Sequence, residues 1–243
     1  MAKLTNSQVL KLIEKGTKLP LATQNYPSRG QTAIQELYQT KKGRLFLKRP
    51  SLRNHKECQI NIDSGTLAER EYWSFKLASH IGLEVPLLWL IDQQTTVQAW
   101  LNYPDALQFT TSQGKLTTHA LNIFECGLFD WLTGQVDRHN ANYLYNFADE
   151  KIILIDSAHC FLKYTGSIPH YLELFEVGYA QELNKKILSP IKNKITDLTE
   201  PTIKKLIPLR DNTESEALIN RLDEIKNATC INDLIHLYRK GKK

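Results

Sequence analysis

The chain has 243 residues, 42% hydrophobic and 23% charged, a globular composition large enough for one substantial core or two small lobes. No run approaches the roughly 18 apolar residues of a membrane-spanning helix, and the N-terminus lacks the apolar core of a secretory signal. The four cysteines form no Cys-x-x-Cys pair, which argues against a zinc site and for a reducing compartment. We therefore expect a cytoplasmic protein, with export or delivery into a host cell left open.

The net charge of +5 is unevenly distributed along the chain. Residues 1–60 hold 12 Lys and Arg against 3 Asp and Glu, whereas residues 61–160 hold 5 against 12. A basic portion followed by an acidic one suits a nucleotide site, where cations meet phosphates and carboxylates meet Mg²⁺. Anionic lipid or nucleic acid would also attract the basic portion. Its cations are dispersed and accompany no recognition motif, so we do not expect nucleic acid as a partner.

The first predicted element is a short amphipathic helix over residues 5–15, with Asn6 or Ser7 as its N-cap. Extended segments follow, separated by proline and glycine. One of the intervening turns reads Ser-Arg-Gly-Gln-Thr, and its backbone N–H groups could cover a phosphate. Gln31 and Thr32 of this turn are therefore candidate nucleotide contacts; the alternative is an ordinary turn between strands.

Two strands are predicted over residues 33–39 and 44–48, joined by a hairpin loop that ends in glycine. Lys48 closes the alternation Leu-Phe-Leu-Lys of the second strand. A lysine that points inward beside apolar residues needs an anion to offset its desolvation. One alternative is an outward lysine at the end of the strand, and the neighbouring Arg49 is a rival for the same role.

The clearest helix of the first half spans residues 66–81. Thr66 and Glu69 fit a capping box, which gives Glu69 a structural role. Glu71 shares the inward face of this helix and is free for another role. The alternative is an exposed glutamate near the start of a charged helix.

A hairpin is predicted next, over residues 87–91 and 95–101, and a polar linker follows it. The helix predicted over residues 117–133 is apolar nearly all round, so we expect it to be buried. Within it, Trp131 is expected in the core rather than stacked on a ligand.

The residues that carry chemistry lie between Asp130 and Phe161. An apolar helical run ends in Asp-Arg-His-Asn-Ala-Asn, and a β-hairpin then delivers a further aspartate. Such a hairpin can bring Asp137, Asn142 and Asp156 to one point. Two carboxylates and an amide oxygen are hard ligands, suited to Mg²⁺ bound together with substrate phosphates. Phosphoryl transfer uses these parts.

This segment resembles the catalytic and metal-binding loops of the phosphoinositide 3-/4-kinase-like superfamily, which shares the protein-kinase fold. In that superfamily Asp-Arg-His-x-x-Asn is followed by a strand that ends in Ile-Asp, often with His and Phe shortly after. The matching residues are Asp137, Arg138, His139, Asn142, Ile155, Asp156, His159 and Phe161. The chain departs from many kinases in carrying Ser157-Ala158 in place of Phe-Gly, and the alanine restricts the backbone there.

The resemblance implies a two-lobed, protein-kinase-like α+β fold. A small N-terminal lobe, with an antiparallel sheet and one helix, would span residues 1–101 and bind the nucleotide. A mostly helical C-terminal catalytic lobe would span residues 102–243. Gln98, Trp100 and Leu101 would lie where the chain crosses between the lobes and meets adenine.

The resemblance also assigns roles within the site, with ATP and Mg²⁺ as cofactors. Lys48, paired with Glu71, would hold the α- and β-phosphates. Asp137 would act as the general base or orient the acceptor hydroxyl, while Asn142 and Asp156 would bind the metal.

Three further residues complete this expected catalytic loop. His139 would either support the loop by hydrogen bonding or contact the transferring phosphoryl group. Arg138 would brace the loop by pairing with a carboxylate, and Asp130 would support it.

Beyond Phe161 the pattern is mostly helical and contains no readable acceptor motif. Helices are predicted over residues 170–188, 201–208, 214–227 and 231–240. We expect a kinase that modifies a protein Ser or Thr rather than an inositol lipid, because no lipid-binding appendage is recognisable. The alternatives are a non-catalytic nucleotide-binding scaffold (a pseudokinase) and AMP transfer on the same fold.

Overall fold

The computed structural model describes residues 4–21, 34–51, 56, 60–105, 122–139, 141–163, 190–230 and 233–234. The turn that contains Gln31 and Thr32 lies outside these residues. So do the predicted helix over residues 170–188 and most of the one over residues 231–240.

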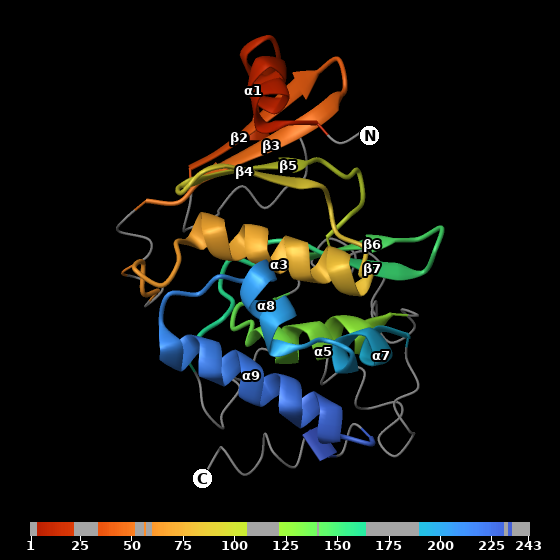
Figure 1. The fold of residues 1–243 in the computed structure, drawn as a ribbon. Helices are drawn as coiled ribbons and strands as arrows, with labels where there is room; N and C mark the ends of the chain where they lie inside the picture. The colour runs from red at the N-terminus through yellow and green to blue at the C-terminus, as the bar shows by residue number, and fades with distance from the viewer. Residues whose placement is uncertain are drawn as a thin grey trace.

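The first part of the chain forms a five-stranded antiparallel sheet with the strand order β1-β2-β3-β5-β4. Its strands are β1 (Thr17–Leu19), β2 (Ile34–Thr40), β3 (Gly43–Arg49), β4 (Leu88–Asp92) and β5 (Thr95–Ala99). Helix α1 (Asn6–Glu14) packs on one face of the sheet, and α3 (Leu67–Ile81) lies along the other (Figure 1).

Strand β3 decides which side chains face α3. Leu45 and Leu47 join an apolar cluster with Val9 and Leu12 of α1. Because successive side chains of a strand point to opposite faces, Lys48 points away from α1 and toward α3. The alternation seen in the sequence therefore puts the lysine inside, where it is buried.

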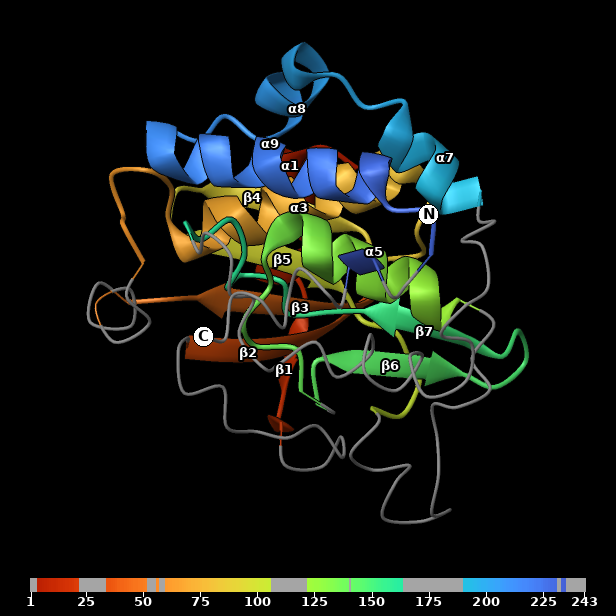
Figure 2. The same ribbon diagram turned by 90° about the horizontal axis from the view of Figure 1, so that it is seen from below.

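The second part of the chain is mostly helical. Its helices are α5 (Ile123–Thr133), α7 (Pro190–Thr196), α8 (Glu200–Leu206) and α9 (Asn212–Asn227). A two-stranded hairpin of β6 (Tyr143–Asn146) and β7 (Lys151–Leu154) accompanies them. Helix α5 lies between α9 and this hairpin (Figure 2).

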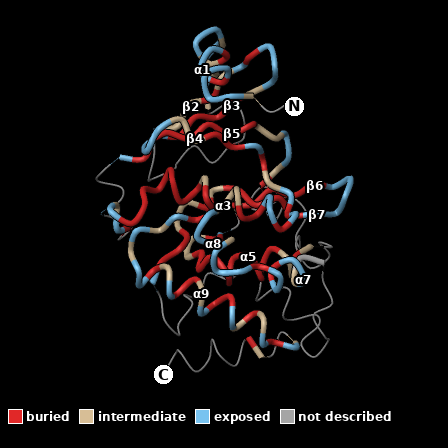
Figure 3. Tube along the Cα trace, in the orientation of Figure 1, coloured by how far each residue is buried: buried red, intermediate tan, exposed pale blue. Residues whose placement is uncertain are grey.

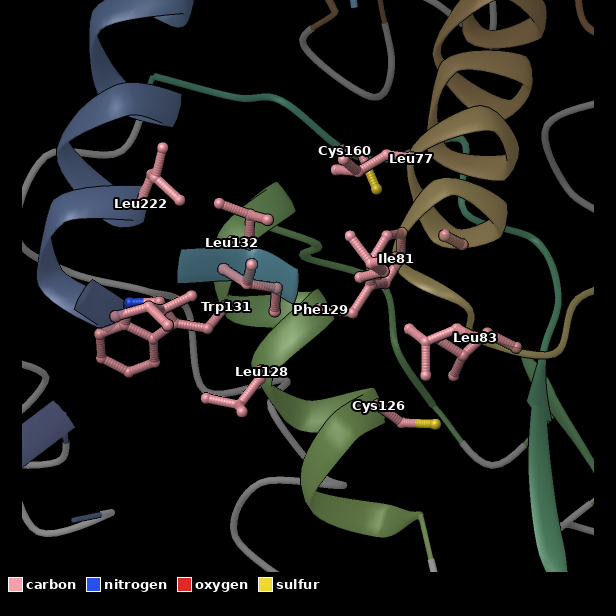
Figure 4. Close-up of a cluster of buried hydrophobic side chains, with 14 of the residues drawn as sticks. Leu77, Ile81, Leu83, Cys126, Leu128, Phe129, Trp131, Leu132, Cys160 and Leu222 are labelled. Atoms are coloured by element: carbon pink, nitrogen blue, oxygen red, sulfur yellow. The ribbon is translucent and has the colours of Figure 1, made fainter. Parts of the chain in front are cut away.

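The largest apolar core joins α3 to the helices of the second part. Leu77 and Ile81 of α3 share this cluster with Leu128 and Leu132 of α5 and with Leu222 of α9 (Figure 4). Helix α3 is buried along most of its length as a result (Figure 3). It is packed between the sheet above it and the helical layer below it.

The ends of α3 follow from the sequence. Thr66 accepts a hydrogen bond from the Glu69 N–H at 3.1 Å, and the Glu69 carboxylate accepts one from the Thr66 N–H at 2.9 Å. This is the predicted capping box. At the other end Gly82 adopts φ 86°, a left-handed conformation that glycine reaches without steric cost.

The N-cap predicted for α1 is wrong. The cap is Thr5, not Asn6 or Ser7. Gln8 lies three residues after Thr5, and its side chain accepts a hydrogen bond from the Thr5 N–H at 2.8 Å, completing a second capping box.

The observed elements confirm the predicted α+β fold, with an antiparallel sheet in an N-terminal lobe and helices in the C-terminal part. Strand β1 and helix α7 were not predicted as separate elements. Among the described residues, no helix is both long enough and apolar enough to span a bilayer.

Substitution of the α9 cap provides a test of this arrangement. Asp211 accepts hydrogen bonds from the N–H groups of Thr213 and Glu214, at 2.8 and 3.3 Å. We expect Asp211→Ala to lower the free energy of unfolding by about 1 kcal/mol, measured by urea denaturation near neutral pH. Asp223→Ala, an exposed change on the same helix, is the control and should be nearly neutral.

The effect of Asp211 should also depend on pH. Hydrogen bonds from the Thr213 hydroxyl and from the N–H groups of α9 hold the pKa of Asp211 below its ordinary value. The carboxylate therefore stabilises the fold above its unfolded pKa of about 4, and this contribution is lost as the pH falls through the folded pKa. The difference between wild type and Asp211→Ala should shrink between about pH 6 and about pH 3; a constant difference would contradict this account.

Candidate active site

Lys48 is the centre of the site. It is 5% exposed, and its Nζ lies 2.6 Å from Glu71 Oε1 and 3.1 Å from Asp156 Oδ1. The second oxygen of Glu71 accepts a hydrogen bond from the hydroxyl of Thr96, at 2.9 Å. Thr96 is the register partner of Lys48 on β5, so the pairing of β3 with β5 fixes the positions of both residues. The three charged residues come from β3, α3 and the segment after β7.

Two neighbouring charged residues of α3 point in different directions. Glu71 points to the sheet, whereas Arg70 is fully buried against the second part of the chain. Arg70 Nη2 lies 2.7 Å from Glu214 Oε2 of α9, and Arg70 Nη1 donates to the carbonyl oxygen of Cys160 at 2.8 Å. Glu71 is thus presented to Lys48 by a helix that is anchored on its other side.

Arg138 and Asp130 brace the loop that follows α5. Arg138 Nε and Nη2 donate to the two oxygens of Asp130 at 2.9 and 3.1 Å, and both side chains are fully buried. Arg138 Nη1 donates to the carbonyl oxygens of Asn142 and, at 2.6 Å, of Ile155. One guanidinium therefore joins the loop to the end of the β6–β7 hairpin.

Burial raises the pKa of Asp130, an effect that the Arg138 guanidinium only partly offsets. Burial alone would lower the pKa of Arg138, but the Asp130 carboxylate more than compensates and raises it. Arg138 therefore stays charged, and its partner is needed to keep that charge inside the protein.

Gln135 is a positioning residue that the sequence analysis missed. It is fully buried; its Oε1 accepts from the Asp137 N–H at 3.2 Å, and its Nε2 donates to the carbonyl oxygen of Asp156 at 3.3 Å. The side chain thereby links the backbones of two aspartates that are 19 residues apart. Its position two residues before Asp137 can be read from the sequence, but its hydrogen-bond partners are brought together only by the folded hairpin.

Asp137 is the more open aspartate, with 41% of its side chain exposed. His159 Nδ1 lies 3.1 Å from Asp137 Oδ2, and Asn142 Nδ2 donates to the Asp137 carbonyl oxygen at 2.7 Å. His139 points outward, with 53% exposure, and its Nδ1 accepts from the Ala141 N–H at 3.2 Å. This hydrogen bond is of the kind expected for the loop-support alternative. His139 Nε2 lies 3.9 Å from Asp137 Oδ1, so His159 is the nearer of the two histidines to the Asp137 carboxylate.

Asp156 follows β7 with φ 51°, a left-handed backbone that non-glycine residues seldom adopt. Burial would raise the pKa of Asp156, but the Lys48 ammonium, His159 and Arg138 outweigh it and lower the pKa. A third of the Asp156 side chain remains exposed. The next residue, Ser157, accepts a hydrogen bond from Arg138 Nη2 at 2.8 Å and, through its carbonyl oxygen, one from the Ser74 hydroxyl at 3.1 Å. Ser157 is thus fixed to Arg138 and to α3.

The donor set fits a magnesium ion better than a transition metal. Among the described residues, no group of three or more His, Cys, Asp or Glu side chains is placed to hold a metal by itself. Mg²⁺ does not need such a cage, because it is usually held by one or two carboxylates together with waters and substrate phosphates. The Asn142 carbonyl oxygen accepts from the Ile155 N–H at 3.3 Å, which keeps Asn142 beside the segment that carries Asp156.

The candidate adenine contacts lie in two different local environments. Gln98 is the register partner of Phe46, so it lies on the Lys48 face of the sheet. The backbone N–H of Trp100 donates to the Arg44 carbonyl oxygen at 3.0 Å, and the Trp100 ring packs edge-on against Phe46. Leu101 packs instead against Leu144, Ile153 and Ile155 of the hairpin region.

No protein-family model matches the chain, and no curated protein is similar to it in sequence. The solved structures that are similar to the chain include two kinases. The Helicobacter pylori proinflammatory kinase CtkA is 13% identical, with a TM-score of 0.46 over 88% of this chain and 93% of that chain. The Rio2 kinase from Chaetomium thermophilum, in complex with ADP, Mg²⁺ and phosphoaspartate, is 14% identical, with a TM-score of 0.48 over 84% and 73%. The placement of each site residue therefore rests on the geometry of this chain alone.

Removal of Asp130 should show how strongly the loop depends on its brace. Asp130→Ala would leave the Arg138 guanidinium buried without a carboxylate, so we expect the free energy of unfolding to fall by about 3–5 kcal/mol in urea denaturation. Asp130→Asn keeps an acceptor in place and should cost less. Asp197→Ala, an exposed change, is the control. An Asp130→Ala protein within about 0.5 kcal/mol of wild type would show that the pair does not hold the loop.

Proposed function

We propose that the chain is an ATP- and Mg²⁺-dependent phosphotransferase that moves the γ-phosphoryl group to a hydroxyl acceptor. The observation that carries this proposal is the buried contact of Lys48 with Glu71 and Asp156, three residues that are far apart in the chain. A buried ammonium next to a partly open carboxylate supplies a cation for phosphate oxygens and an anion for a metal. In this proposal the nucleotide-binding lobe spans residues 1–101 and the catalytic lobe residues 102–243.

Each residue has a role that its surroundings support. Glu71, held by Thr96, would orient the Lys48 ammonium toward the α- and β-phosphates. Asp156 and Asn142 would hold Mg²⁺, which when bound neutralises charge on the phosphate oxygens. The adenine would be bordered by Gln98, Trp100 and Leu101. The phosphates would be contacted by Gln31 and Thr32.

Asp137 would receive the proton of the acceptor hydroxyl. The acceptor oxygen would then form a bond to the γ-phosphorus, while the bond from that phosphorus to the bridging oxygen breaks and ADP leaves with the electron pair. The partial exposure of Asp137 supports this role, because an acceptor has to reach it from outside. The hydrogen bond with His159 would keep the carboxylate aimed at the acceptor.

The acceptor we propose is a protein Ser or Thr in preference to an inositol lipid. The open position of Asp137, whose side chain is 41% exposed, suits an extended polypeptide. The phosphoinositide 3-/4-kinase-like subtype is part of this proposal.

Two substitutions test the roles of the aspartates. We expect Asp137→Asn to lower the rate of phosphoryl transfer by roughly 10²–10⁴-fold, because it removes the proton acceptor while leaving nucleotide binding in place. Asp156→Ala should abolish transfer and remove the Mg²⁺ dependence of nucleotide binding. Asp197→Asn, an exposed change, should keep full activity. Full activity in either site variant would reject the proposal.

The reaction itself is tested by incubating the protein with γ-labelled or α-labelled ATP, a cell lysate and a phosphoinositide mixture. Transfer of the γ-label to protein is the expected result, and transfer to lipid would change the acceptor. Transfer of the α-label would replace phosphoryl transfer by AMP transfer. Nucleotide binding without transfer and without dependence on Mg²⁺ would indicate a scaffold.

A further inference from the structure

A second concave site lies on the other side of the sheet from Lys48. Helix α1 and the β2–β3 turn enclose a cavity of about 370 Å³, which we call the α1 pocket. Its lining residues are Leu4, Gln8, Lys11, Leu12, Lys15, Lys41 and Lys42. Helix α1, which lines the pocket, and helix α9 lie at opposite ends of the molecule (Figure 1).

The lining combines two kinds of chemistry. Leu4, Leu12 and the aliphatic stems of the lysines make an apolar interior, while the lysine ammonium groups reach water around it. Four of the seven lining residues are lysines and none is acidic. The acid of the neighbouring strand, Glu36, is already paired with Lys18, at 2.6 Å. A complementary ligand therefore has a hydrocarbon part and an anionic group.

The choice of lysine narrows the class of ligand. Arginine is the usual residue for bidentate recognition of one phosphate or carboxylate, whereas lysine acts as a mobile point charge. Four exposed lysines on two adjacent elements would attract a surface that carries many negative charges, rather than hold a single anion in one position. Anionic phospholipid at a membrane surface presents such a field, together with acyl chains.

We propose that the α1 pocket docks the protein on an anionic membrane by taking phospholipid between its four lysines. The apolar interior receives part of the lipid, and the ammonium groups contact the headgroup phosphates around it. Helix α1 and the sheet separate this pocket from Lys48, so docking leaves the candidate active site uncovered. The proposal does not depend on the phosphotransferase activity.

The test is co-sedimentation of the full chain with vesicles of phosphatidylcholine alone or with about one-third phosphatidylserine, at low and at high salt. We expect binding only to the anionic vesicles, weakened by salt. A variant with four lysines replaced by glutamine should bind less, by about fivefold for each lysine removed. The four substitutions are Lys11→Gln, Lys15→Gln, Lys41→Gln and Lys42→Gln.

A second variant removes the same number of charges from exposed positions elsewhere, with its unfolding temperature checked in parallel. Its substitutions are Lys151→Gln, Lys163→Gln, Lys204→Gln and Lys205→Gln. It should bind as wild type does. Equal weakening in both variants would overturn the proposal, because net charge alone would then explain binding. Absence of vesicle binding at low salt would also overturn it, as would tighter binding to an acidic peptide or to free glycerophosphate than to the vesicles.

Discussion

The ammonium group of Lys48 imposes the constraint on which the site depends. A lysine that is 5% exposed is stable in its charged form only where carboxylates replace the lost water. Glu71 and Asp156 supply them, one from the helix beneath the sheet and one from the end of the C-terminal hairpin. The charge requirement of one strand residue therefore fixes the relative positions of three elements. It also prepares a place where phosphate and metal charges can be balanced.

Buried arginines do the corresponding work for the backbone of the site. Loop carbonyl groups have no ladder partners, so when they are buried they need donors from side chains. Arg138 donates to carbonyl groups before β6 and after β7, and Arg70 donates to those of Gly65 and Cys160. Each guanidinium also donates to a carboxylate, Asp130 for Arg138 and Glu214 for Arg70. These hydrogen bonds satisfy backbone carbonyl groups in the irregular segments around the aspartates.

Local sequence patterns predicted much of the fold around the site. The capping box at Thr66 and the stop at Gly82 defined α3 almost to the residue, and the Leu-Phe-Leu-Lys alternation placed Lys48 inward. Arg138 was expected to pair with a carboxylate, and it does so with Asp130. Trp131 was expected in the core, where it is 1% exposed.

What escaped prediction depends on pairing over long distances. Thr96 meets Glu71 only through the register of β5 against β3, and Gln135 meets Asp156 only after the hairpin has folded. The partner of Arg70 is a glutamate 144 residues later, which no local pattern reveals. Short elements such as β1 and α7 carry too few residues for a periodicity to be recognised.

The anchoring of α3 has a consequence for how the molecule can move. Pulling this helix away from α9 would strand Arg70 and Glu214 in an apolar interior, at a cost of several kcal/mol. Helix α3 also meets the sheet side through polar contacts of its own, namely Glu71 with Lys48 and Thr96, and Thr66 with the carbonyl oxygen of Gln93. The Arg70–Glu214 pair and the shared apolar core therefore tie α3 to the helical part of the chain, so that a displacement of α3 would have to disturb both.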